Sequence, residues 1–285
     1  MARKLTDDGR VFIVAEIGAN HNQKIETAIQ LVLAAKEAGA DAVKIQMYTP
    51  DDLTLNRPDW VMGKGPWVGQ TLYELYEKTC MPYSFIPTLQ EVARGINIAL
   101  FTSVYAPETV DIAEGYDFPY YKTASFEIGY EDLHKRLAKT GKPVFISMGN
   151  AEFTTVWKTL QFYRGNKDVY LLKSVPKYPA DPSEYNLMTL YDIAKYVQGR
   201  VGLSDHSKSC TAAIGAVCAG ARIIEAHLTT EWDAPDMSVS RFSDSFADLV
   251  KRIREAEKVM GKCFYGGESI LTRKVVDGRS VRVPL

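Results

Sequence analysis

The sequence predicts an α/β fold, a (β/α)8 TIM barrel, and three observations favour it. Short apolar runs rich in β-branched residues alternate with longer amphipathic stretches nearly throughout the 285 residues. About eight such runs occur, and each is apolar on both faces, as parallel strands covered by helices are. The length also suits such a barrel, which takes about 250 residues. An open doubly wound sheet is the alternative, but no GxGxxG turn follows the first strand to favour it.

The expected strands are these apolar runs, taken in chain order: Val11–Gly18, Ala42–Met47, Ala99–Val104, Tyr120–Ser125, Pro143–Met148, Val169–Val175, Val201–His206 and Ile223–Thr229. Amphipathic stretches between them, such as Ile25–Gly39 and Pro107–Tyr116, predict helices. Several of these stretches end in glycine, which is a helix-stop signal.

One connection is too long for a simple turn. Between the second and third strands lie a polar segment with two tryptophans and two helical patterns, around Leu72–Cys80 and Phe85–Ile98. Long connections of this kind are usually functional or disordered, and this one leaves the carboxyl end of the second strand. We therefore expect one domain over residues 1–285, with a lid or substrate wall inserted at about 48–98 and a C-terminal tail at about 265–285.

Composition excludes several classes of protein. The net charge is −1, which argues against nucleic-acid or membrane-surface binding. No run reaches the roughly 18 apolar residues of a membrane span, and the first ten residues lack an export signal. The four cysteines form no CxxC pair, so buried, reduced thiols and a cytoplasmic location are expected.

Polar residues gather where the expected strands end. In a barrel, the carboxyl ends of the strands carry the chemistry, whereas strand interiors fill the core. Unpartnered polar groups there would cost much desolvation free energy, so their convergence predicts an active site, with a structural polar network as the alternative. The residues concerned are Glu16, Asn20, His21, Lys44, Gln46, Ser103, Lys122, Ser125, Glu127, Ser147, Ser204, Asp205, His206, Glu225, His227 and Thr229.

Two of the four histidines, His206 and His227, end the seventh and eighth strands. Neighbouring strands lie about 4.8 Å apart, so both imidazoles can reach one metal ion over the same rim. A hydrogen-bonded core histidine or an acid–base group is the alternative for each. With no thiolate nearby, a borderline to hard divalent ion is expected. His134, within a helical pattern, is expected on the surface without a role.

Lys44 and Lys122 also end strands, each with serines near by. Such point charges with neutral donors suit a phosphate or carboxylate, and ion pairing to Glu16 and Glu127 is the alternative. Lys122 and Ser125 have opposite parity, so both reach the mouth only if the strand bulges or ends before Ser125.

Several motifs together resemble the sialic acid synthase (N-acetylneuraminate synthase) family. They are AEIGANHN, KIQ, YKTAS, YPA, GLSDHS, EAHLTT and PDMSVS, in the family's order and spacing from Val11 to about Ser280. The resemblance implies a (β/α)8 barrel that condenses phosphoenolpyruvate with an N-acylated hexose, similar to N-acetylmannosamine. The implied products are a nonulosonic acid and phosphate, and the implied cofactor is Mn²⁺ or Mg²⁺.

The resemblance also implies roles for single residues. His206 and His227 match the metal ligands, and Glu16, Gln46, Glu127 and Asp236 match positions near the sugar and the attacking water. Glu127 is our choice for handling the proton of that water. The positions that match phosphoenolpyruvate binding are Lys44, Ser103, Lys122, Ser125, Ser147, Asn186 and Ser204.

Departures from the family pattern fall in loops that could contact the sugar. The motif after the fifth strand reads SMGN, the usual GPDH reads APDM, and Gln23 replaces a glycine. The antifreeze-like domain that usually follows the barrel is expected to be lacking, removed or supplied by a separate chain. A homodimer is implied by the resemblance.

Three alternatives remain open. A related synthase for pseudaminic, legionaminic or another ulosonic acid would differ only in the sugar that it accepts. A metal-independent Schiff-base aldolase would use Lys44, Lys122 or Lys173. A non-catalytic paralogue that serves as a binding or regulatory subunit is the alternative that is not an enzyme.

Overall fold

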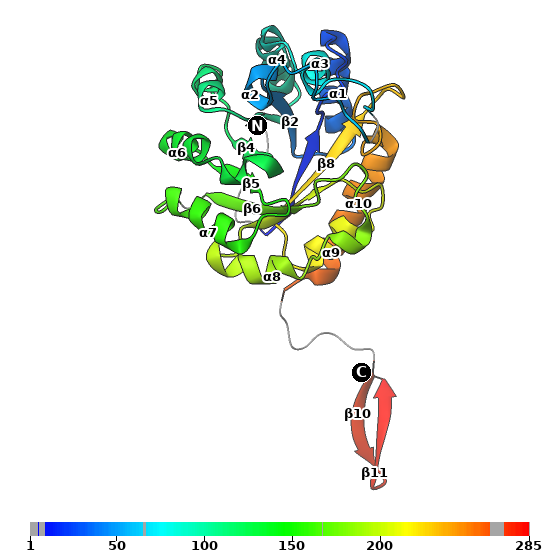
Figure 1. The fold of residues 1–285 in the computed structure, drawn as a ribbon. Coiled ribbons are helices and arrows are strands. Elements are labelled where there is room, and N and C mark those ends of the chain that lie inside the picture. Colours follow the sequence, from blue (N-terminus) through cyan, green and yellow to red (C-terminus); the bar gives the residue numbers. More distant parts are fainter. Residues whose placement is uncertain (1–4, 6–8, 65–66, 167, 263–270, 285) are drawn as a thin grey trace.

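The computed structural model describes residues 5, 9–64, 67–166, 168–262 and 271–284. Eight parallel strands form a closed barrel, which confirms the predicted fold (Figure 1). Each strand pairs with the next in sequence, and β8 pairs back with β1, where Glu16 lies opposite His227. The strands are β1 (Phe12–Glu16), β2 (Ala42–Met47), β3 (Ala99–Val104), β4 (Tyr121–Thr123), β5 (Val144–Ser147), β6 (Val169–Ser174), β7 (Val201–Asp205) and β8 (Ile223–Thr229).

Helices surround this barrel in an outer ring (Figure 1). The α-helices are α1 (Ile25–Glu37), α2 (Pro50–Leu53), α3 (Leu72–Thr79), α4 (Ile86–Gly95), α5 (Pro107–Glu114), α6 (Glu131–Thr140), α7 (Phe153–Phe162), α8 (Thr189–Ile193), α9 (Thr211–Cys218) and α10 (Ser243–Met260). Four 3₁₀ helices supplement them: η1 (Tyr83–Phe85), η2 (Ser125–Gly129), η3 (Pro182–Glu184) and η4 (Ala194–Tyr196). A two-residue strand, β9 (Arg241–Phe242), extends the sheet beyond β8.

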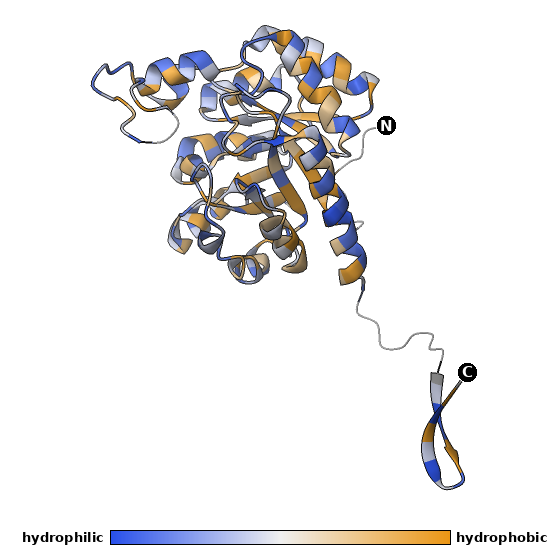
Figure 2. Cartoon of the chain, turned by 90° about the vertical axis from the view of Figure 1, so that its right-hand side faces the viewer, coloured by the Kyte–Doolittle hydropathy of each residue, from blue (hydrophilic) through white to orange (hydrophobic). Residues whose placement is uncertain are grey.

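The barrel interior has an apolar half and a polar half. Side chains near the amino ends of the strands, including Phe12, Phe101 and Phe145, form an aromatic cluster that fills the lower half. Further along the same strands, the inward positions are occupied by Glu16, Lys44 and other polar residues. The apolar part of the interior ends at this level. Figure 2 shows the hydrophobic residues concentrated along the inner strands and hydrophilic ones on the outer helix faces. The polar side chains inside the barrel therefore lie at the carboxyl ends of the strands, above an apolar core.

The segment after β2 is longer than any other barrel connection. It holds α2 and α3, and a single antiparallel bridge joins Val61 to Thr71. The following helix, α4, packs against α1 and β3 as an ordinary barrel helix does. The extra segment is thus residues 48–85, shorter than the 48–98 that the sequence predicts.

After α10 the structure describes an antiparallel hairpin of β10 (Leu271–Val276) and β11 (Arg279–Pro284). The sequence predicts only a tail at 265–285, of which residues 265–270 and 285 lie outside the described residues. Figure 1 shows the hairpin apart from the barrel. Among the described residues, no helix has the length and apolar character needed to span a bilayer.

The expectation of buried cysteines is wrong for the cysteines that the structure describes. Cys80 and Cys210 are partly exposed and Cys218 is exposed, and all three are free thiols. Each lies near a helix end in the outer ring, where solvent reaches it. Cys263 lies outside the described residues.

Candidate active site

A cavity of about 910 Å³ opens at the carboxyl ends of the barrel strands. Its size is typical of a site for a small molecule. Most of the predicted site residues line this one cavity: Glu16, Lys44, Gln46, Lys122, Ser125, Glu127, Ser147, Ser204, His206, His227 and Asp236. The alternation of inward side chains along parallel strands is what brings them together.

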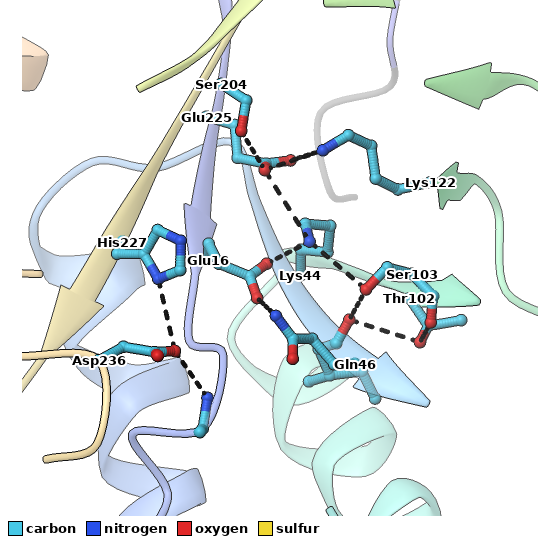
Figure 3. Close-up of polar contacts among 12 residues, drawn as sticks. Glu16, Lys44, Gln46, Thr102, Ser103, Lys122, Ser204, Glu225, His227 and Asp236 are labelled. Atoms are coloured by element: carbon cyan, nitrogen blue, oxygen red, sulfur yellow. Dashed lines mark hydrogen bonds and ion pairs between the residues drawn. The ribbon is translucent and has the colours of Figure 1, made fainter. Parts of the chain in front are cut away.

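The floor of the cavity is a buried cluster of charged groups (Figure 3). Lys44 Nζ lies 2.6 Å from a carboxylate oxygen of Glu16, and Lys122 Nζ lies 3.0 Å from Glu225. Ser204 Oγ donates to the same Glu225 oxygen at 2.9 Å. The ion pairing that was the alternative reading of the lysines is therefore present, although the partner of Lys122 is Glu225 and not Glu127.

These ion pairs leave donors for a ligand. Burial alone would raise the pKa of Glu225, but Lys122 and Lys44 outweigh it and lower that pKa to about 2. Glu225 is therefore an anion that orients the lysine beside it. An ammonium group has three donors, and among the described residues Lys122 donates only to Glu225. At least one N–H of Lys122 stays available to an anionic group in the cavity.

The two predicted metal ligands lie side by side. The ring centroids of His206 and His227 are 5.5 Å apart. His206 Nδ1 is 2.7 Å from the Val175 carbonyl oxygen, which can only accept, so Nδ1 carries the proton and Nε2 keeps its lone pair. Burial lowers the pKa of His206 to about 4, so this ring is neutral. Tyr178 stacks on it at 4.6 Å between ring centroids.

His227 offers an unsatisfied nitrogen. Its Nδ1 is buried without a hydrogen-bond partner and lies 3.6 Å from Asp236 Oδ2. Burial acts to lower the pKa of His227, and Asp236 more than offsets this. The pair of imidazoles suits one divalent ion. Two rings with centroids 5.5 Å apart can each place a nitrogen about 2.1 Å from a shared metal ion. Within the described part of the chain no cluster of three or more His, Cys, Asp or Glu side chains has a metal-binding arrangement, so the remaining ligands would be water or substrate.

Glu127 lies on η2, directly after β4, and its carboxyl group lines the cavity. Its Oε2 atom is buried without a hydrogen-bond partner. Burial raises the pKa of Glu127 to about 7. A carboxyl group with this pKa can gain or lose a proton near neutral pH, as acid–base catalysis requires.

His134 is buried, so its expected place on the helix surface is wrong. It lies on the inner face of α6, between Leu133 and Leu137, because that face packs against η2 and α7. Its Nε2 is 3.0 Å from the Glu127 carbonyl oxygen, and its Nδ1 is 2.9 Å from the Tyr163 hydroxyl. Burial lowers its pKa to about 4, so the neutral ring donates to Glu127 and accepts from Tyr163. His134 thereby fixes the turn that carries Glu127.

Ser125 reaches the cavity because β4 ends at Thr123 and η2 begins at Ser125. This removes the parity conflict with Lys122 that the sequence raised. Ser125 Oγ lies 2.8 Å from Ser174 Oγ. Ser103 lies one layer below the cavity, 3.5 Å from Lys44 Nζ and 3.2 Å from the Tyr105 hydroxyl.

Asn186 does not join the site, contrary to the prediction. It is exposed on the loop after η3, and its side-chain amide donates to the Glu184 carbonyl at 3.1 Å. The neighbouring Tyr185 points inward instead, and its hydroxyl donates to Asp205 at 2.6 Å. Asp205 also binds the backbone N–H of Ser207 and so holds the loop that carries His206.

The upper wall of the cavity comes from the long segment after β2. Its contribution is largely apolar or aromatic: Leu53, Met62, Trp67, Leu72, Leu75 and Tyr76. Sequence reasoning placed a wall here but named none of these residues, because each reads as an ordinary apolar position. Tyr178 was also missed, although it lies within the YPA motif.

Comparisons with known proteins agree with this architecture. The sequence profile of the NeuB family matches residues 31–265. Pseudaminic acid synthase of Campylobacter jejuni is 37% identical over 278 residues, which cover 95% of this chain and 80% of that protein. Pseudaminic acid synthase of Helicobacter pylori is 35% identical, with 88% of this chain and 75% of that protein covered.

A solved structure supports the fold independently. The sialic acid synthetase of Leptospira borgpetersenii superposes with a TM-score of 0.83 at 24% identity, over 91% of this chain and 88% of that one. At this identity the likeness concerns the fold. The profile match and the two relatives show that this chain belongs to the NeuB family, a family of phosphoenolpyruvate-condensing synthases.

Proposed function

We propose that the chain condenses phosphoenolpyruvate with an open-chain N-acylated hexose to give a nonulosonic acid and phosphate. The observation that carries the proposal is the buried cluster of Lys44, Lys122, Glu16 and Glu225 beside the imidazole pair, at the mouth of the barrel. The reaction joins two anionic or polar reactants and needs cationic binding groups, an electrophile activator and a proton acceptor. The cavity holds residues for each need.

Phosphoenolpyruvate would be held by the lysines and the serines around them. Lys44 and Lys122 supply charge, while Ser125 and Ser147 supply neutral donors from two different strand ends. Ser204 lines the same cavity but donates its hydroxyl proton to Glu225. Glu16 and Glu225 already balance both lysines, so a trianionic substrate needs further positive charge. A divalent ion held by His206 and His227, Mn²⁺ or Mg²⁺, would provide it and would polarise the aldehyde of the sugar as a Lewis acid.

The remaining carboxyl groups would serve the sugar and the water. Glu16, bonded to Gln46 at 2.8 Å, and Asp236 line the sugar side of the cavity. Carbon–carbon bond formation leaves positive charge on the former enol carbon, and water adds there before phosphate leaves. Glu127 accepts the proton of that water, because its raised pKa makes it a stronger base than an ordinary glutamate.

We propose that the acceptor is a sugar of the kind from which pseudaminic acid is made, and not N-acetylmannosamine. The support is twofold: the two relatives named above are pseudaminic acid synthases, and the wall above the site is apolar. Such a wall suits acetamido methyl groups and a deoxy carbon better than free hydroxyl groups. The test is a comparison of kcat/KM for mono-N-acyl, di-N-acyl and deoxy hexoses. A higher value for N-acetylmannosamine than for a diacetamido-trideoxy hexose would contradict this choice.

The dependence of kcat on pH should follow the ionisation of Glu127. As a base it must be ionised, so kcat is expected to rise as pH passes through about 7 and to level off above it. Glu127→Gln should lower kcat about 100-fold and remove this rise. If kcat of Glu127→Gln still rises near pH 7, a residue other than Glu127 is the base.

The same variant has an expected effect on stability. The folded pKa of Glu127 is raised, so the folded state binds the proton more tightly and loses stability as pH rises toward 7. Glu127→Gln should therefore be more stable than the wild type at pH 8, with the difference shrinking toward pH 5. Thermal unfolding at both pH values measures this, and an equal effect at the two would contradict the pKa assignment.

Two glycines offer a matched pair of variants. Gly149 (φ +53°) and Gly141 (φ +67°) both have left-handed backbone, so alanine should cost each about 1 kcal/mol of stability. Only at Gly149 would the new Cβ crowd the site, lying 2.8 Å from Ser125 Cβ, whereas at Gly141 nothing lies within 4 Å. We expect Gly149→Ala to raise the KM for phosphoenolpyruvate and Gly141→Ala to leave it unchanged. Equal KM values in the two variants would remove Ser125 from the binding site.

A Schiff-base aldolase is the second candidate function. The observation that favours it is Lys122, whose pKa burial lowers despite Glu225. Lys173 is a poor candidate, because it points to the helix side of β6 and donates to the Gly149 carbonyl. Borohydride in the presence of pyruvate would label Lys122 covalently in an aldolase, and we expect no label.

A further inference from the structure

A second cavity, of about 390 Å³, lies at the opposite end of the barrel from the active site. It is formed by the end of α7, the loop that leads into β6, and the turn after η4 that leads into β7. The residues that matter here are Trp157, Gln161, Tyr163, Arg164, Tyr196 and Arg200. Apart from Tyr163, which bonds to His134, none of them has a part in the site described above.

Two polar atoms of this cavity lack partners, although Arg200 Nη1 donates to Gln198 Oε1 at 3.2 Å and Gln161 Nε2 donates to the Trp157 carbonyl at 2.9 Å. Arg200 Nε and Gln161 Oε1 are both buried without a hydrogen bond, which is costly for a donor and an acceptor. Arg164, which is exposed at the rim, has no ion pair within the described part of the chain. No carboxylate is among the described residues that line the cavity. Two arginines without a counter-charge make the cavity a site for an anion.

The wall beside the arginines is aromatic. The rings of Trp157 and Tyr196 lie 5.8 Å apart at 71°, and their side chains are 45% and 43% exposed. Phe153 extends the same surface, with its ring centroid 4.9 Å from that of Tyr196. Such a corner of exposed rings stacks against a flat base or the apolar face of a sugar ring.

We propose that this cavity binds a small anion that carries a ring. The phosphate or carboxylate contacts Arg164 and Arg200, the ring lies against Trp157 and Tyr196, and Gln161 accepts a hydrogen bond from a ring substituent. Nucleoside monophosphates and sugar acids share this chemistry.

The cavity is connected to the active site by hydrogen bonds. Tyr163, in its wall, bonds to His134, and His134 donates to the carbonyl of Glu127. One turn earlier on α7, Thr159 Oγ1 donates to the Ile128 carbonyl at 2.5 Å. Thr159 on α7 thus contacts η2 directly, and Tyr163, the residue after α7, contacts it through His134. The Glu127 carboxyl group on η2 lines the active site. A ligand that shifts the end of α7 would change the position of Glu127, so we infer that the second cavity is an effector site.

Binding is tested first, by calorimetry with three probes: a nucleoside monophosphate, a six-carbon sugar acid and inorganic phosphate. We expect one ring-bearing probe to bind at least tenfold more tightly than phosphate, in the presence of saturating phosphoenolpyruvate. Trp157→Ala and Arg164→Gln should each weaken it at least tenfold, and Arg94→Gln, an exposed arginine on α4, should not. Equal affinity for phosphate, or no effect of the two cavity variants, would overturn the site.

The connection is tested second, with Tyr163→Phe, which keeps the ring in the cavity wall and removes the hydroxyl. In the wild type the bound probe should change the apparent affinity for phosphoenolpyruvate about fivefold, and phosphoenolpyruvate should change the affinity for the probe by the same factor. Tyr163→Phe should keep probe binding within twofold and abolish both changes. Binding without any change in the wild type would refute the effector role. This arm needs phosphoenolpyruvate binding, which rests on the proposed function. In the calorimetry phosphoenolpyruvate serves only to fill the active site, and the two cavity variants locate the probe whether or not phosphoenolpyruvate binds.

Discussion

Replacing His206 or His227 with alanine should lower kcat by roughly 10³-fold and abolish binding of Mn²⁺. The reason is that the two rings, 5.5 Å apart, are the only neighbouring imidazoles lining the described part of the cavity, and a divalent Lewis acid contributes several kcal/mol to such reactions. The measurements are steady-state phosphate release and isothermal titration with Mn²⁺. His227→Ala should keep the fold, because His227 Nδ1 makes no hydrogen bond that the core would miss. His206→Ala loses the bond to the Val175 carbonyl, so its fold is checked by circular dichroism.

The control for this prediction is Asp236→Asn. Asp236 lies 3.6 Å from His227 and also accepts from the Ala19 backbone N–H, a bond that asparagine can keep. We expect it to weaken metal binding about 10-fold to 100-fold, as loss of a group that supports a ligand does, and to retain measurable turnover. Full activity in either alanine variant, with a wild-type circular dichroism spectrum, would remove the metal assignment.

Lys122→Ala should raise the KM for phosphoenolpyruvate about 100-fold and lower the free energy of unfolding by about 3 kcal/mol. The first effect follows from loss of a buried cationic donor, which costs a bound anion several kcal/mol. The second arises because Glu225 keeps its charge but loses its 3.0 Å partner, leaving only Ser204 and the more distant Lys44. Saturation kinetics and urea unfolding measure the two effects.

A double variant separates binding from structure. Lys122→Met together with Glu225→Gln removes both charges of the pair, so most of the stability should return. The affinity for phosphoenolpyruvate should not return, because the cation is still missing. If the double variant recovers both stability and affinity, Lys122 has a structural role only.

The barrel could be predicted because its strands are defined by burial on both faces. In Val169–Val175, for example, four residues with apolar or aromatic side chains precede the first charged one, and the structure moves no predicted strand end by more than two residues. Alternation along the strands then fixed which side chains share a face. It correctly grouped Glu16, Lys44 and His227 at one mouth, although Glu16 and His227 are 211 positions apart in the chain.

Residues outside the strands could not be placed in this way. Asn186 and Tyr185 are adjacent, and only the turn of the loop decides that the tyrosine points inward and the asparagine outward. His134 reads as a surface residue because charged neighbours surround it in sequence, but the helix face that carries it is covered by α7. The partner of Lys122 was also missed, since Glu225 comes from β8, across the barrel from β4.

The most direct measurement is phosphate release from phosphoenolpyruvate with Mn²⁺ present, recorded with and without an N-acylated hexose and with and without EDTA. Release should require both the sugar and the metal, and one nonulosonic acid should form for each phosphate. Release without a sugar, or release that EDTA leaves unchanged, would contradict a metal-dependent condensation at this site.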